Sequence, residues 1–124
     1  MKNEDCALFE ALEKIFHEPN RLAIMSALCA ADEGLSFTEL KEQCNLTDGN
    51  LNRHLKVLQE TGAVNIKKAF VDDKPKTTVS ISANGLKRFN EYLTALSEVL
   101  AVAQKSLPAE NKVRAVPIGK TAIA

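Results

Sequence analysis

The chain has 124 residues, 45% of them hydrophobic and 26% charged, and its sixteen basic and sixteen acidic side chains give a net charge of zero. This length and composition predict one globular domain and exclude a wholly disordered chain. A balanced net charge argues against binding to nucleic acid, because domains that bind it often carry a basic excess.

The sequence also indicates the cellular compartment of the protein and whether it holds a cofactor. It has no apolar stretch of the length that a membrane-spanning helix or a secretory signal requires. The three cysteines, Cys6, Cys29 and Cys44, are odd in number and lack CxxC spacing, which indicates neither a disulfide framework nor a metal site. We therefore expect a cytoplasmic protein that has no contact with a membrane and holds no metal or other cofactor.

The first third of the chain has the periodicity of helices. Apolar residues at helical spacing predict a first helix over 5–16. Pro19 is expected in the first turn of a second helix, which stops near Gly34. Thr38 is expected to cap a short third helix.

A fourth helix follows after a tight turn at Asn45 and Leu46. Thr47 is its expected N-cap, and Gly62 is a typical helix-ending residue, so this helix spans about 47–62. The short turn between the third and fourth helices can place the fourth in the major groove of DNA.

The fourth predicted helix has an apolar side and a polar side. The apolar side must face the core and consists of Leu51, Leu55 and Leu58. His54 lies between these leucines, so we expect it to be partly buried rather than catalytic or metal-binding. On the polar side and its flank, Arg53 and Asn50 are of the types that read guanine and adenine edges through paired hydrogen bonds.

The segment 64–82 alternates apolar and polar residues with a period near two, which predicts two β-strands. Turn-forming residues at 72–75 divide it, so we expect a β-hairpin with a charged tip. Lys68 interrupts the alternation on the apolar side.

Ser82 is expected to cap a long last helix, whose apolar residues recur at alternating intervals of three and four. A small domain has little interior with which to cover so long a helix. We therefore interpret it as a dimerisation helix, with core packing inside one domain as the alternative. Residues 107–124 lack clear periodicity and are expected to form a flexible tail, which leaves a domain of residues 1–106.

Two stretches resemble a known family. Residues 47–64 read TDGNLNRHLKVLQETGAV and resemble the recognition helix of winged helix-turn-helix transcriptional regulators. The likeness continues through residues 67–89 and is strongest to the small MarR/ArsR-like branch. It implies a mainly α fold with a β-hairpin wing (α+β), and a homodimer that binds a roughly palindromic operator in double-stranded DNA. The fourth helix would enter the major groove, with the wing along the backbone or the adjacent minor groove.

The resemblance also implies which residues contact DNA and which contact a second chain. On the fourth helix the DNA contacts are Thr47, Asp48, Asn50, Asn52, Arg53 and Lys56. On the wing they are Lys68, Lys74, Lys76 and Thr77. The first and last helices would form the dimer through Leu8, Leu12, Ile15, Phe89, Leu93, Leu96 and Leu100. Asp72 and Asp73 depart from a basic wing, because a carboxylate near phosphate is unfavourable.

Other functions find less support in the residues. No phosphate-binding loop, metalloprotease motif or nucleophile elbow occurs, so we do not expect an enzyme. We interpret the chain as a dimeric DNA-binding repressor, because an operator-bound dimer can block a promoter. The main alternative is a winged-helix module that binds another protein and no specific DNA. A small-molecule effector between the dimer helices and the DNA-binding lobe would add to the first interpretation.

The net charge of zero does not exclude binding to DNA, because the charges are unevenly distributed along the chain. Residues 49–76 carry six basic and three acidic side chains, whereas residues 1–35 carry three basic and seven acidic ones. The neutral sum therefore hides a dipolar molecule. We expect weak non-specific attraction to DNA, so that base contacts must supply more of the affinity.

Overall fold

The computed structural model of the chain describes residues 13–108. Its elements in chain order are α2 (Pro19–Cys29), β1 (Leu35–Ser36), α3 (Phe37–Cys44), α4 (Asp48–Glu60), β2 (Val64–Val71), β3 (Lys74–Ile81) and α5 (Ala83–Lys105). The predicted α+β arrangement of helices, a hairpin and a long last helix is confirmed. Most of the tail expected over 107–124 lies outside the described residues.

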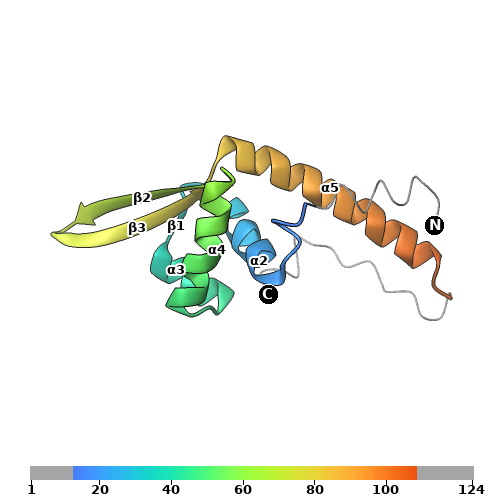
Figure 1. The fold of residues 1–124 in the computed structure, drawn as a ribbon, viewed down its shortest axis with the longest axis horizontal. Helices are drawn as coiled ribbons and strands as arrows, with labels where there is room; N and C mark the ends of the chain where they lie inside the picture. The colour runs from blue at the N-terminus through green and yellow to red at the C-terminus, as the bar shows by residue number, and fades with distance from the viewer. Residues whose placement is uncertain (1–12, 109–124) are drawn as a thin grey trace.

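Figure 1 shows that α2, α3 and α4 pack together, that the hairpin of β2 and β3 projects from them, and that α5 extends away on the opposite side. None of the helices within residues 13–108 is long and apolar enough to cross a membrane. The core includes buried side chains from all four of these helices and from the sheet, among them Ile24, Leu40, Leu51, Val79 and Phe89.

The start of three helices is confirmed as predicted. Pro19 occupies the first turn of α2. Thr47 caps α4, where its Oγ1 accepts a hydrogen bond from the backbone N–H of Asn50 at 3.2 Å. Ser82 caps α5 in the same way, accepting from the N–H of Gly85 at 2.8 Å. Each cap satisfies a backbone donor that a helix leaves unpaired in its first turn.

The predicted cap of α3 is wrong, because Ser36 and not Thr38 begins that helix. The hydroxyl of Ser36 accepts from the Glu39 N–H at 3.1 Å, while the Glu39 carboxylate accepts from the Ser36 N–H at 3.0 Å. This reciprocal pair satisfies two backbone donors at once. Thr38 therefore lies inside the helix.

Two boundaries in the N-terminal part also differ from the prediction. Residues 13–16, the end of the helix expected over 5–16, form a turn, and the rest of that helix lies outside the described residues. The second helix ends at Cys29 instead of near Gly34. Gly34 has a φ of 89°, and a Cβ there would lie 2.5 Å from the carbonyl oxygen of Val79. Its role is thus to let β1 approach β3 closely.

The three strands form an antiparallel sheet in the order β1-β3-β2. The sequence did not predict β1, which consists of Leu35 and Ser36 paired with Val79 and Thr78. A strand of two residues has no periodicity from which it could be recognised.

The hairpin turn is shorter than the predicted 72–75. Asp72 and Asp73 have φ values of 52° and 63°, which is the left-handed conformation of the two-residue turns that suit hairpins. Lys74 and Pro75 already belong to β3. The eight residues of β2 therefore pair with the eight of β3 up to the turn.

The first half of α5 joins the core. Gly85 faces the backbone of Ala63 so closely that a Cβ would overlap the carbonyl oxygen of Ala63. Phe89 packs edge-on against Phe16 with 5.4 Å between ring centroids, and Tyr92 stacks beside it. Only 1% of Phe89 is exposed in the single chain. Phe89, expected among the contacts to a second chain, is thus packed in the core of the single chain.

Candidate nucleic-acid interface

The exposed start of α4 carries the two predicted base-reading side chains. Asn50 and Arg53 lie one turn apart, and the Asn50 Oδ1 accepts a hydrogen bond from the Arg53 guanidinium at 3.4 Å. Both side chains are exposed. The helix thus presents an amide and a guanidinium together, which can donate to and accept from base edges.

Asp48 is balanced by a neighbouring cation. It occupies the first residue of α4, and its carboxylate lies 2.9 Å from the Nζ of Lys41 on α3. The N-terminal end of a helix dipole also favours a negative charge at this position. These two features account for an acidic residue at the polar end of α4.

The apolar side of α4 holds the helix against the core, and His54 is part of that contact. The predicted burial of His54 is confirmed, since 4% of the residue is exposed. Its Nδ1 lies 3.3 Å from the guanidinium of Arg21 and 3.8 Å from the carboxylate of Glu18, both at the start of α2. Burial lowers the pKa of His54, and the nearby Arg21 acts in the same direction while Glu18 opposes it. His54 thereby joins α4 to the start of α2.

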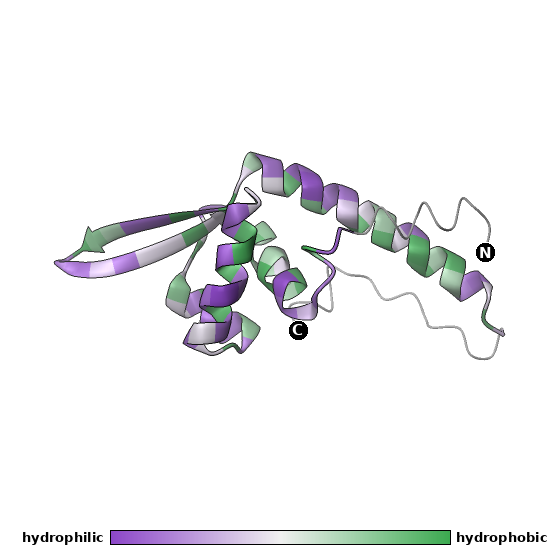
Figure 2. Ribbon diagram, in the orientation of Figure 1, coloured by the Kyte–Doolittle hydropathy of each residue, from purple (hydrophilic) through white to green (hydrophobic). Residues whose placement is uncertain are grey.

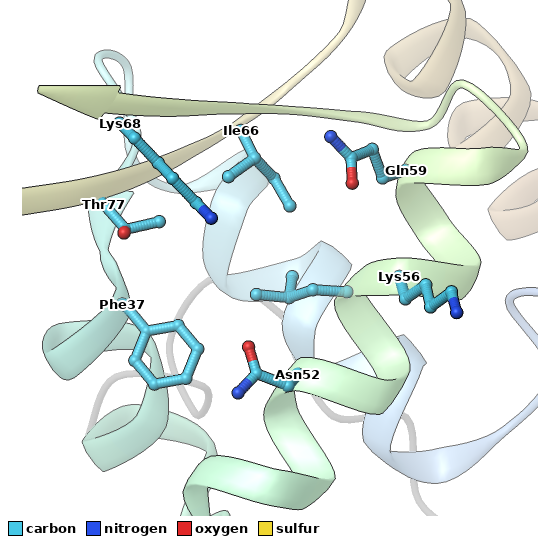
Figure 3. Close-up of a pocket in the computed structure, with 8 residues that line it drawn as sticks. Phe37, Asn52, Lys56, Gln59, Ile66, Lys68 and Thr77 are labelled. Carbon is cyan, nitrogen blue, oxygen red and sulfur yellow. The ribbon is translucent and has the colours of Figure 1, made fainter.

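A cleft of about 820 Å³ lies between α4 and the hairpin (Figure 3). The residues that line it are Phe37 of α3, Asn52, Leu55, Lys56 and Gln59 of α4, Ile66 and Lys68 of β2, and Thr77 of β3. In Figure 3 the Lys68 side chain extends from β2 towards the middle of the cleft, with Asn52 on the opposite wall. None of these eight side chains is acidic, so the cleft favours an anionic occupant.

The cleft brings together four of the predicted DNA contacts, namely Asn52 and Lys56 from α4 with Lys68 and Thr77 from the wing. Two further lining residues, Gln59 and Phe37, were not predicted from the sequence. Gln59 lies seven residues after Asn52 and three after Lys56, so the helical spacing could have identified it. Nothing in the local sequence indicates Phe37, because only the fold carries the start of α3 to the hairpin.

Lys74 and Lys76 are not part of this cleft. They alternate with Pro75 and Thr77 along β3 and therefore point to the other face of the sheet. Lys76 lines a smaller cleft of about 260 Å³ beside the start of α3. Hydrogen bonds from Ser36 are the main cause that lowers the pKa of Glu39 there, and the charge of Lys76 contributes. Part of the Lys76 charge is thus offset by an acidic neighbour.

The outer side of α5 carries exposed leucines. Leu86, Leu93 and Leu100, with Leu107 just beyond the helix, are 40–54% exposed and are spaced seven residues apart. Ile15 and Leu96 are half-buried against the core. Leu8 and Leu12 lie outside the described residues.

Sulfur and metal chemistry find no site in residues 13–108. Cys29 and Cys44 are free, and burial raises the pKa of both thiols. In this part of the chain no group of three or more His, Cys, Asp or Glu side chains is placed to hold a metal ion. Cys6 lies outside it.

The chain is similar in sequence to a known protein family and to an individual protein. Residues 20–100 match a family model described as a winged helix DNA-binding domain. An uncharacterised protein of Methanocaldococcus jannaschii is 41% identical over 80 residues, which cover 64% of this chain and 86% of that protein.

Solved structures show the same fold. A transcriptional regulator homologue from Pyrococcus horikoshii has 30% sequence identity and a TM-score of 0.71, and the match covers 81% of this chain and 97% of that one. The regulator MosR of M. tuberculosis, solved in complex with DNA, has 18% identity and a TM-score of 0.60 over 84% of this chain and 74% of its own. At that identity the likeness to MosR shows the fold alone.

Proposed function

The chain belongs to the winged helix DNA-binding domain family, and from this premise we propose that it is a dimeric repressor that binds a roughly palindromic DNA operator. The observation that carries the proposal is the pair of Asn50 and Arg53 on the exposed start of α4, beside a cleft without acidic residues. A helix that only had to pack on the core would not need asparagine and glycine in its exposed first turns, where they are poor helix formers.

In this proposal α4 enters the major groove with its first turns towards the bases. Arg53 donates to a guanine and Asn50 pairs with an adenine. Thr47 contacts a phosphate, and Asp48 accepts from a cytosine amino group. Base contacts of this kind supply the sequence specificity, whereas contacts to phosphates fix the position of the protein on the duplex.

The cleft between α4 and the hairpin receives the phosphate strand that separates the major groove from the adjacent minor groove. Lys56 and Lys68 would bind the phosphates from the two walls, with Asn52 and Thr77 donating further hydrogen bonds. Lys74 and Lys76, on the other face of the hairpin, contribute charge at longer range. With only these few cations, we expect affinity for random DNA to be weak.

We propose that the exposed leucines of α5 form the dimer contact. A spacing of seven residues keeps Leu86, Leu93, Leu100 and Leu107 along one side of the helix, as in two helices that pack together. Ile15 and Leu96 would flank this stripe, and Leu8 and Leu12 would add to it from the N-terminal segment. Two identical chains related by a twofold axis would read two half-sites of opposite direction.

The experiment that tests this function is selection of duplexes from a random DNA pool by the purified chain. We expect an enriched motif with two inverted half-sites whose centres are about one helical turn apart, or a multiple of that. Recovery of no motif would contradict specific DNA binding and favour the alternative, in which the winged helix binds another protein. A single half-site would contradict the dimer.

A further inference from the structure

The outer end of the wing carries an exposed aromatic side chain. Phe70 is 78% exposed, more than any other large hydrophobic residue described, and Figure 2 shows the end of β2 as apolar beside a largely polar β3. An exposed phenylalanine at the end of a projecting hairpin contributes nothing to the core. We therefore expect the Phe70 side chain to contact a binding partner.

The register of the hairpin shows which way Phe70 faces. Side chains on a strand alternate between faces, so Ile66, Lys68 and Phe70 share one face of β2. Phe70 is paired with Pro75, just as Lys68 is paired with Thr77. Since Ile66, Lys68 and Thr77 line the cleft opposite α4, Phe70 and Pro75 continue that same face outward from the cleft.

We propose that Phe70 and Pro75 form an apolar wedge that packs into the minor groove of the bound DNA. The proposal rests on the proposed function, in which the cleft holds a phosphate strand. Two residues along a strand advance about 7 Å, and the minor groove is about 6 Å wide. With Lys68 and Thr77 on the phosphates, Phe70 and Pro75 therefore lie over the adjacent minor groove, where apolar wedges can enter between base steps.

The charges around the wedge favour DNA over a protein as its partner. Four lysines lie within six residues of Phe70 along the hairpin, Lys68 on the same face and Lys67, Lys74 and Lys76 on the opposite face. A hairpin with an apolar pair on one face and cations on both faces is complementary to a groove that has sugars on its walls and phosphates on its two rims. Asp72 and Asp73 lie at the turn, where phosphates would repel them, so the face of the hairpin and not its tip makes the contact.

The hairpin is stiff enough to act as a wedge. The pairing of β2 with β3 runs without a bulge to the residues that flank the turn. The two left-handed aspartates close it in the two-residue form that suits the strand twist. The backbone at Phe70 is therefore held in the strand before DNA binds, and little backbone freedom is lost when it does.

The test compares Phe70→Ala with Val71→Ala on the operator selected by the wild-type chain. Val71 is the matched control, because it is the next residue, is 49% exposed and points to the opposite face. We expect Phe70→Ala to weaken binding roughly tenfold to a hundredfold, the effect of leaving a phenylalanine unburied. Val71→Ala should change the affinity less than about twofold, and Phe70→Leu should retain most of it. Thermal unfolding should be nearly unchanged in each variant, since the replaced side chains are outside the core.

Hydroxyl-radical cleavage, which attacks the sugars from the minor groove, supplies the second readout. Sugars next to the half-site that the wild type protects should become accessible with Phe70→Ala but stay protected with Val71→Ala. Unchanged affinity and footprint for Phe70→Ala would overturn the wedge while leaving the proposed function intact. A change of oligomeric state with normal DNA binding would overturn it in favour of a contact between chains. Failure of the wild type to bind any duplex would overturn both proposals.

Discussion

Arg53 is the residue on which the proposed base recognition depends most. We expect Arg53→Ala to lower the affinity for the selected operator by about 1–3 kcal/mol and to relax specificity at one base position. A titration against the operator and its single-base variants measures both effects. Lys87→Ala, which removes one positive charge from an exposed position on α5, serves as the control and should behave like the wild type. If Arg53→Ala binds and discriminates like the wild type, the recognition face has been assigned wrongly.

His54 makes stability depend on pH. Burial is the main cause that lowers its pKa in the folded chain below the ordinary value of about 6.5. As the pH falls through 6.5, the unfolded chain takes up the proton first, so the stability that is complete above this pH is progressively lost below it. We expect the free energy of unfolding to decrease between pH 7 and pH 5 in the wild type and to decrease less in His54→Gln. Urea denaturation at several pH values measures this free energy. An equal decrease with pH in the wild type and in His54→Gln would contradict the role given to His54.

At the scale of elements, the fit of α5 onto the rest of the domain depends on Gly85. A methyl group there would overlap the carbonyl oxygen of Ala63, which is backbone and cannot move aside. We expect Gly85→Ala to destabilise the fold by about 1–3 kcal/mol, as overpacking does. Gly49 in α4 has open space around its Cβ position, so Gly49→Ala should leave stability unchanged or raise it by up to about 1 kcal/mol. Urea denaturation of the two variants measures the difference, and equal effects would contradict the close approach.

The elements that the sequence predicted correctly are those with local signals. The caps Thr47 and Ser82 and the alternating hairpin can be recognised from neighbouring residues alone. By contrast, β1 exists only through its pairing with β3. The side of α5 that packs inward could not be decided either, because its leucines and aromatics suggest more than one apolar face. The contact between Phe89 and Phe16 determines which side of α5 packs against the core.

The candidate site could be predicted in part for the same reason. Asn50 and Arg53 were identifiable from the wheel of one helix. The cleft was not, because Lys68 and Phe37 reach it from segments about thirty residues apart that meet only in the folded chain. The exposure of Phe70 was equally hidden, since Phe70 has the same spacing as Val64 and Ile66, which are buried or half-buried. The structure leaves the outer end uncovered.

At the scale of the whole molecule, the proposed dimer joins two weak half-sites into one operator. Leu100 is exposed in the single chain, so Leu100→Glu should leave the fold intact while placing a charge in the proposed dimer contact. We expect sedimentation to show a shift from dimer to monomer and operator affinity to fall by at least tenfold. Thr94→Glu adds the same charge at an exposed polar position and should remain dimeric. A Leu100→Glu variant that stays dimeric would show that α5 contacts its partner elsewhere.

The distribution of charge across the molecule is consistent with the proposed recognition of DNA by sequence rather than by charge alone. Residues 49–76, which form most of α4 and the hairpin, carry six basic and three acidic side chains, while the net charge of the whole chain is zero. Electrostatic attraction alone should therefore hold random DNA only weakly.

The most direct measurement is the affinity of the wild-type chain for its selected operator and for a scrambled duplex of the same length at physiological salt. We expect the operator to bind at least about a thousandfold more tightly than the scrambled duplex. An affinity no tighter than about 10⁻⁴ M for both duplexes would contradict it.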